Sequence, residues 1–128
     1  MTLLLDTHVF IWMINEDRFI SPKARDLMAD LDNSLFLSAA SYWEICIKTS
    51  IGKLELGRNW KAAIDRELEF NNVQWLPIRK NHSQGICALP GIHKDPFDRL
   101  LISQAKCEKM TLVTADKNIQ KYPFKWIW

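Results

Sequence analysis

The feature that most restricts the fold of this chain is a run with an apolar side chain at every position, Leu3-Leu4-Leu5, which stops at the carboxylate of Asp6. A strand with one face in water alternates apolar and polar residues, whereas a strand without alternation is typical of a parallel sheet covered on both faces. Leu35-Phe36-Leu37 repeats the pattern further along the chain. We therefore predict buried parallel strands over both segments.

The rest of the chain alternates between helical and strand-like patterns. A polar residue followed by proline, at Ser21-Pro22 and again at Asp95-Pro96, is a typical helix start. Strands that alternate with helices predict a three-layer α/β/α sandwich around a mostly parallel sheet of four or five strands. With 128 residues and no linker or repeat, we expect one domain over residues 1–128. Further strands are predicted for 73–78, 111–114 and 124–127, and helices for 7–14, 22–31, 38–50, 59–70, 79–88 and 95–110.

Apolar spacing predicts which side of each helix is buried. In the helix over 38–50, Trp43, Ile47 and Ile51 recur at i, i+4 and i+8 and are expected to face inward. Leu31 and Phe70 take inward positions in the helices on either side. Among the tryptophans, Trp126 and Trp128 are candidates for packing on a partner subunit, and the core is expected to hold Trp12, Trp43, Trp60 and Trp75.

Composition excludes several classes of protein. The net charge of +2 permits nucleic-acid binding without requiring it. Three unevenly spaced cysteines form neither a disulfide framework nor a thiolate zinc site, and Cys46 and Cys87 are expected to be small buried residues. We see no signal peptide and no run long enough to cross a bilayer, so a cytoplasmic protein without membrane contact is expected.

Four acidic residues from distant segments are predicted to meet at one edge of the sheet. Asp6 closes the first strand, and Asp116 follows the fourth strand, two residues past Thr114. Glu44 lies about two turns into the helix after the second strand, and Asp98 lies in the first turn of the helix before the fourth. Ligands of open parallel sheets bind beyond the carboxyl ends of the strands, which is where these acids would lie.

Converging carboxylates repel one another and raise one another's pKa values unless a cation lies between them. Mg²⁺ prefers oxygen ligands and keeps several waters, and such waters can attack a phosphodiester. The four acids therefore predict a centre for a hard divalent cation that supports hydrolysis of phosphodiester bonds.

Each acid also has a purely structural explanation. Asp6 could cap the helix that follows it, Asp98 could favour the helix dipole, Asp116 could serve a turn, and Glu44 could face solvent. Asp95 precedes a proline and is well explained as an N-cap. Only a shared location of all four acids points to chemistry.

Four stretches of the chain resemble the PIN domain family, and more narrowly the VapC-type ribonuclease toxins of bacterial toxin–antitoxin pairs. They are LLLDTHVFIW (3–12), SAASYWEICIKTSIGKL (38–54), LPGIHKDPFDRLLISQA (89–105) and LVTADKNIQKY (112–122). The resemblance implies that Asp6, Glu44, Asp98 and Asp116 are the catalytic and metal-binding acids. It also implies supporting hydroxyls at Thr7 and Thr114, with Asp95 as an extra acid that could join the pocket through water.

The resemblance further implies an endoribonuclease that depends on Mg²⁺ or Mn²⁺ and acts as a toxin. Its implied partners are an RNA substrate, a cognate antitoxin that covers the pocket, and a second copy of the chain in a homodimer. Two alternatives remain: a non-catalytic module that binds nucleic acid or a partner, and a phosphotransferase with Asp6 as nucleophile.

Other polar residues have two open readings. His8 and His93 lie beside predicted pocket residues, so each either contacts substrate or serves packing and solvation, whereas His82 is expected on a helix surface. Lys48 and Arg99 either approach a phosphate or form ordinary solvated ion pairs. A loose basic cluster is a candidate for tracking an RNA backbone, and its members are Lys48, Lys53, Arg58 and Lys61.

Overall fold

The computed structural model describes all residues from Met1 to Trp128, and its centre is a parallel sheet of five strands in the order β3-β2-β1-β4-β5. The chain builds outward from β1 in one direction and then returns to place β4 on the other side of β1. The strands are β1 (Thr2–Leu5), β2 (Ser34–Ser38), β3 (Val73–Leu76), β4 (Thr111–Val113) and β5 (Trp126–Ile127). Every neighbouring pair is parallel, which confirms the predicted sheet.

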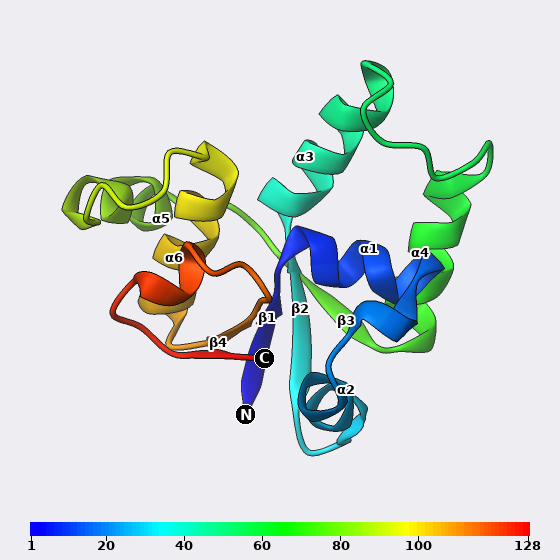
Figure 1. The fold of residues 1–128 in the computed structure, drawn as a ribbon, viewed down its shortest axis with the longest axis horizontal. Coiled ribbons are helices and arrows are strands. Elements are labelled where there is room, and N and C mark those ends of the chain that lie inside the picture. Colours follow the sequence, from blue (N-terminus) through cyan, green and yellow to red (C-terminus); the bar gives the residue numbers. More distant parts are fainter.

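Helices cover both faces of this sheet and complete the predicted three-layer sandwich (Figure 1). Helices α1 (Thr7–Asn15), α2 (Pro22–Ala29) and α4 (Trp60–Phe70) lie on one side, and α5 (Lys80–Gly85) and α6 (Pro96–Glu108) lie on the other. Helix α3 (Ala39–Ser50) leaves the carboxyl end of β2. Short 3₁₀ turns complete the chain: η1 (Asp17–Phe19), η2 (Ile86–Ala88) and η3 (Ile119–Lys121). No helix has the length and apolar character needed to cross a bilayer.

The first strand shows why its sequence lacks alternation. Leu3 and Leu5 point into the hydrophobic cluster beneath α1, α2 and α4, while Leu4 points into the opposite cluster beneath α6. All three side chains are fully buried. Because β1 is central and covered on both faces, each of its side chains needs to be apolar.

The predicted helix starts are confirmed by their hydrogen bonds. The Ser21 hydroxyl accepts from the backbone N–H of Ala24 at 3.1 Å, and proline follows at the first helical position. Asp95 Oδ1 accepts from the N–H groups of Phe97 at 2.8 Å and Asp98 at 3.2 Å. These caps fix where α2 and α6 begin and therefore fix the orientation of the side chains in the first turn of α6.

The predicted buried face of α3 is wrong. The Trp43 and Ile51 side chains are 57% and 58% exposed, whereas Ser41, Glu44 and Ile45 are buried. Helix α3 contacts both α1 and α6, and a small residue such as Ser41 permits that approach. The largest apolar side chains therefore lie on the solvent side, where Trp43 packs edge-on against Phe97 with ring centroids 5.3 Å apart.

Several other predicted core positions lie outside the core. Leu31 is exposed because α2 ends before it, and Phe70 is exposed as the last residue of α4. Trp75 is exposed because β3 is an edge strand, whereas Trp12 and Trp60 are half-buried against the first cluster. Cys46 is half-buried and Cys87 is exposed on a 3₁₀ turn, so the prediction of two fully buried thiols is wrong.

His82 is fully buried, and its predicted place on a helix surface is wrong. Its Nδ1 accepts from the backbone N–H of Arg79 at 3.0 Å, and its Nε2 lies 2.8 Å from Glu108 Oε1. The hydroxyl of Ser103, a residue of α6, donates to the backbone carbonyl of His82. These bonds join α5 to α6, so polar partners offset the cost of burying the imidazole.

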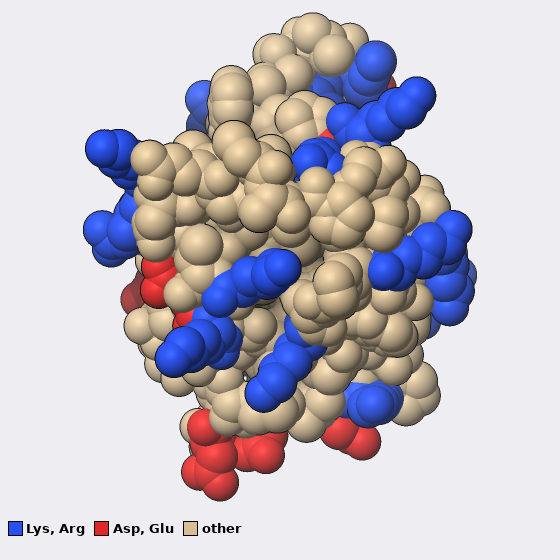
Figure 2. Space-filling model, turned by 90° about the vertical axis from the view of Figure 1, so that its left-hand side faces the viewer, with Lys and Arg blue, Asp and Glu red and all other residues tan.

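Most of the charged side chains on the side of the molecule where α5 and α6 lie are basic. Figure 2 shows Lys and Arg spread across this face, with Asp and Glu near its edges. Such a face favours an anionic partner. The exposed lysines of α5, of α6 and its flanking residues, and of the connection between β4 and β5 are Lys80, Lys94, Lys106, Lys109, Lys117, Lys121 and Lys125.

Candidate metal centre

Asp6 continues the backbone of β1 beyond the last strand residue. Its N–H donates to the carbonyl of Val113 at 3.0 Å, so the main chain is held against β4. The side chain is buried, and its Oδ2 accepts from the Thr114 hydroxyl at 2.6 Å, while its Oδ1 has no hydrogen-bond partner. Burial raises the pKa of Asp6, and the Thr114 hydrogen bond opposes that shift.

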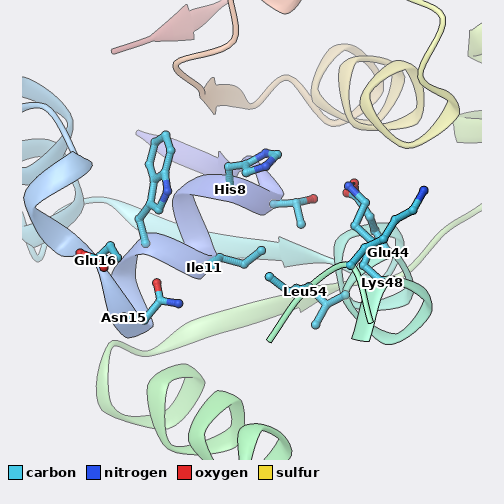
Figure 3. A pocket seen from close by; sticks show the side chains of 11 residues that line it. His8, Ile11, Asn15, Glu16, Glu44, Lys48 and Leu54 are labelled. Carbon is cyan, nitrogen blue, oxygen red and sulfur yellow. The ribbon is translucent and has the colours of Figure 1, made fainter. Parts of the chain in front are cut away.

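Glu44 reaches the same region from α3 and is also buried. Its Oε2 accepts from Lys48 Nζ at 2.7 Å, one turn along the helix, and its Oε1 has no partner (Figure 3). The hydrogen bond to Glu44 raises the pKa of Lys48, so the ammonium stays charged. The Thr7 hydroxyl donates to Ser41 Oγ at 2.8 Å and so joins the start of α1 to α3, rather than bonding to an acid.

Asp98 projects from the first turn of α6, with its side chain 14% exposed. Burial raises the pKa of Asp98 to about 8, and the negative charges of Asp6, Asp95, Glu44 and Asp116 add to the shift. Repulsion from all four places Asp98 at the meeting point of the acids. Asp95 contributes charge here although its Oδ1 caps the helix.

Asp116 is the most exposed of the four acids, with 34% of its side chain accessible. Its N–H donates to Thr114 Oγ1 at 3.1 Å, so one hydroxyl contacts both Asp6 and Asp116. Its Oδ1 accepts from the N–H groups of Asn118 and Ile119 just before and at the start of η3. The other oxygen remains available to the centre.

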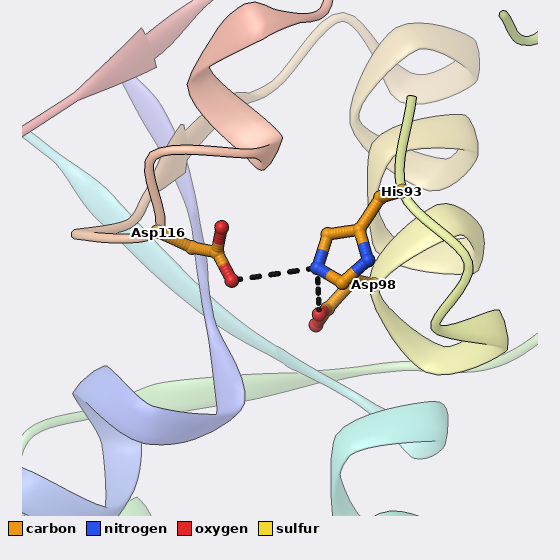
Figure 4. Close-up of side chains that lie close together, drawn as sticks. All are labelled: His93, Asp98 and Asp116. Carbon is orange, nitrogen blue, oxygen red and sulfur yellow. Dashed lines mark ion pairs between the residues drawn. The ribbon is translucent and has the colours of Figure 1, made fainter. Parts of the chain in front are cut away.

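His93 joins two of these acids, a contact that the spacing of residues did not identify. Its Nε2 lies 3.0 Å from Asp98 Oδ2 and 3.5 Å from Asp116 Oδ2 (Figure 4). Since Nδ1 accepts from the N–H of Asp95 at 3.2 Å, the proton of a neutral imidazole lies on Nε2, which therefore donates toward the carboxylates. The feature of the sequence that points to this contact is that His93 lies two residues before Asp95, the N-cap of α6.

Arg99 holds the segment that carries His93. Its guanidinium donates to the carbonyls of Pro90 at 2.8 Å and Ile86 at 3.3 Å, and to the Tyr122 hydroxyl at 3.2 Å. That hydroxyl also accepts from the N–H of His93 at 2.8 Å. Arg99 therefore binds backbone carbonyls rather than an acid or a solvated anion, and it positions the loop before α6.

The chemistry of this cluster fits a hard divalent cation. Asp6 and Glu44 each keep one buried oxygen without a partner, an arrangement that is costly unless something else binds there. The pKa of Asp98 is raised by its acidic neighbours, a conflict that a positive ion removes. His93 Nε2 and the nearest oxygens of Asp98 and Asp116 lie within 4.8 Å of one another, so the two carboxylates that the imidazole joins are close enough to share one ion.

Comparison with known proteins agrees with the fold. Residues 3–125 match the family model for the PIN domain. No curated protein sequence matches the chain significantly. Solved structures of the same fold include VapBC2 from Rickettsia felis bound to a DNA fragment from its promoter. That structure has a TM-score of 0.78 and 19% identity, covering 99% of this chain and 98% of the other.

Two further structures are similar over almost their whole length. VapBC-1 from nontypeable Haemophilus influenzae has a TM-score of 0.63 and 21% identity, covering 99% of this chain and 97% of that one. A toxin–antitoxin complex from Klebsiella pneumoniae has a TM-score of 0.62 and 15% identity, with coverages of 98% and 96%. At these identities the structures establish the fold alone, while the family model covers nearly every residue. The chain belongs to the PIN domain family.

Proposed function

We propose that this protein is a metal-dependent endoribonuclease and the toxin of a toxin–antitoxin pair. The observation that carries the proposal is the pair of buried, unpartnered oxygens, Asp6 Oδ1 and Glu44 Oε1, beside an Asp98 whose pKa is raised to about 8. A binding module would gain nothing from burying carboxylates in this way, because each costs stability when it is unpaired.

The residues that would hold Mg²⁺ or Mn²⁺ are Asp6, Glu44, Asp98 and Asp116. When bound, the ion would supply an activated water and neutralise charge that develops on the phosphate. Other side chains fix the acids: Thr114 orients Asp6, and His93 orients Asp98 and Asp116. Lys48 balances the charge of Glu44 and is close enough to the acids to attract a phosphodiester.

Two observations support the partners that we propose. The similar structures are described as VapBC and toxin–antitoxin complexes, which supports a cognate antitoxin that covers the pocket. The basic face in Figure 2 favours RNA as the substrate. We also propose that the chain acts in the cytoplasm, as one domain, and as a homodimer.

Purified chain, free of any antitoxin, tests the activity directly. RNA should be cleaved with Mg²⁺ or Mn²⁺, and EDTA should stop the reaction. Asp6→Asn and Glu44→Gln should each lose most of the activity while keeping the wild-type circular dichroism spectrum. Glu69→Gln removes an exposed carboxylate of α4 and serves as the matched control. Undiminished cleavage by Asp6→Asn would remove that residue from the proposed centre.

A further inference from the structure

Two hollows flank the acidic centre, and they share a pair of aromatic residues. The larger one, about 420 Å³, lies between α1 and α3 and includes Glu44 in its wall (Figure 3). The smaller one, about 200 Å³, includes Asp6 and Asp116. His8 and Trp12 line both hollows. A ligand that occupied both hollows would therefore pass the carboxylates on its way from one to the other.

Trp12 is held in place from several sides. Its ring centroid lies 5.8 Å from that of Phe19 and 5.8 Å from that of Trp128. The exposed His8 ring lies 6.1 Å away, one turn earlier in α1. An aromatic ring fixed before binding offers a platform on which a planar group can stack without further ordering of the protein.

The larger hollow combines three kinds of side chain that suit a nucleotide. Ile11 and Leu54 approach one another from α1 and from the segment after α3 and form an apolar wall. The Asn15 amide can donate to and accept from a base edge. Lys48 and Lys53 also line this hollow; Lys48 pairs with Glu44, and Lys53 forms no ion pair.

We propose that Trp12 and Lys53 form a subsite in the larger hollow that holds one unstacked base and its phosphate next to the cleavage site. The proposal rests on the ribonuclease function proposed above and adds to it the residues that position the substrate. Lys48 and Lys53 contact the backbone, which then passes the four acids and places the neighbouring nucleotide toward the smaller hollow. Bases of a duplex are already stacked and paired, so they cannot enter such a pocket, whereas bases of loops and single strands can.

Metal-free protein in EDTA allows binding to be measured without cleavage. The probes are fluorescein-labelled eight-nucleotide strands of oligo(A), oligo(C) and oligo(U) and a blunt RNA duplex, followed by fluorescence anisotropy. At least one single strand should bind more tightly than the duplex. Trp12→Leu, which keeps apolar bulk but removes the ring, should weaken that binding about tenfold, and Trp12→Phe should restore most of it. Lys53→Gln should weaken binding and lower its salt dependence.

Phe70→Leu is the matched control, because it removes an exposed aromatic ring far along α4 and should leave binding unchanged. Thermal unfolding identifies any variant that no longer folds, in which case Trp12→Phe and Lys53→Gln decide. Equal binding of duplex and single strands, or wild-type affinity in Trp12→Leu, would overturn the proposal. Loss of a dimer in Trp12→Leu, measured by sedimentation, with unchanged RNA binding, would assign the larger hollow to a second copy instead. Binding that depends on Trp12 without any cleavage in Mg²⁺ or Mn²⁺ would refute the nuclease and leave the subsite standing.

Discussion

Replacing Asp98 with asparagine should stabilise the metal-free protein at neutral and mildly alkaline pH. Folding raises the pKa of this carboxyl from its ordinary value of 3.8 to about 8, because it is buried among other acids. The unfolded chain therefore loses its proton near pH 4, whereas the folded chain keeps it until about pH 8. The folded state binds more protons across this window, so wild-type stability falls as pH rises through it.

The size of the effect follows from the gap between the two pKa values. A gap of about four units sets an upper limit of about 6 kcal/mol at pH 8 and above. Water and salt reach the partly exposed carboxylates and weaken the repulsion, so about 2 kcal/mol is a realistic gain for Asp98→Asn. The asparagine oxygen can still accept from His93 Nε2, and the variant therefore loses charge without losing that contact.

Urea unfolding in EDTA at several pH values between 5 and 8 measures this difference. The advantage of Asp98→Asn should be small at pH 5 and grow toward pH 8. In a parallel series with Mg²⁺ in place of EDTA, the ion should stabilise wild type more than the variant. Glu69→Gln should follow the wild-type curve, since Glu69 is exposed and away from the centre. Parallel curves for wild type and Asp98→Asn over the whole range, or a less stable variant at pH 8, would refute the convergence of charges on Asp98.

Two further substitutions test the support of the centre and the core beneath it. Thr114→Val removes the hydroxyl that contacts both Asp6 and Asp116. The variant should bind Mn²⁺ about tenfold more weakly, or worse, in a calorimetric titration. Unchanged affinity would mean that this hydroxyl does not orient the acids. Leu4→Ala should cost about 2–5 kcal/mol in urea unfolding, because Leu4 is fully buried, whereas Leu31→Ala, at a 99% exposed position, should cost about 0.5 kcal/mol or less. Similar costs for both would contradict the assignment of the core.

The layers of the fold could be predicted because they depend on local patterns. Leu3-Leu4-Leu5 is apolar throughout because consecutive residues face two different clusters, and that property is visible in the sequence. Ser21 and Asp95 mark helix starts because capping uses neighbouring residues only. Such patterns need no knowledge of the rest of the chain.

The buried face of α3 could not be predicted in the same way. Apolar periodicity assumes that a helix buries its largest apolar side chains, but α3 buries Ser41 and Glu44 toward α1 and the acidic centre. Trp43 and Ile51 are left on the solvent side. The rule fails where burial serves a polar site rather than the core.

The positions of the acids could be predicted to the level of the sheet edge, but their contacts could not. Asp6 and Asp116 follow strands that pair side by side, so their proximity is a matter of topology. The contact of His93 with Asp98 depends on a loop that Arg99 and Tyr122 hold in place from outside it. Contacts of this kind between distant segments have no signature in the spacing of residues.

Calorimetric titration of the metal-free protein with Mn²⁺ tests the central claim, that the four carboxylates form one cation centre. Wild type should bind the ion with a saturable heat signal, and Asp6→Asn and Glu44→Gln should each lose most of that affinity while staying folded. Glu69→Gln should bind as wild type does. Absence of Mn²⁺ binding to wild type, or full binding by Asp6→Asn, would contradict a metal centre at this edge of the sheet.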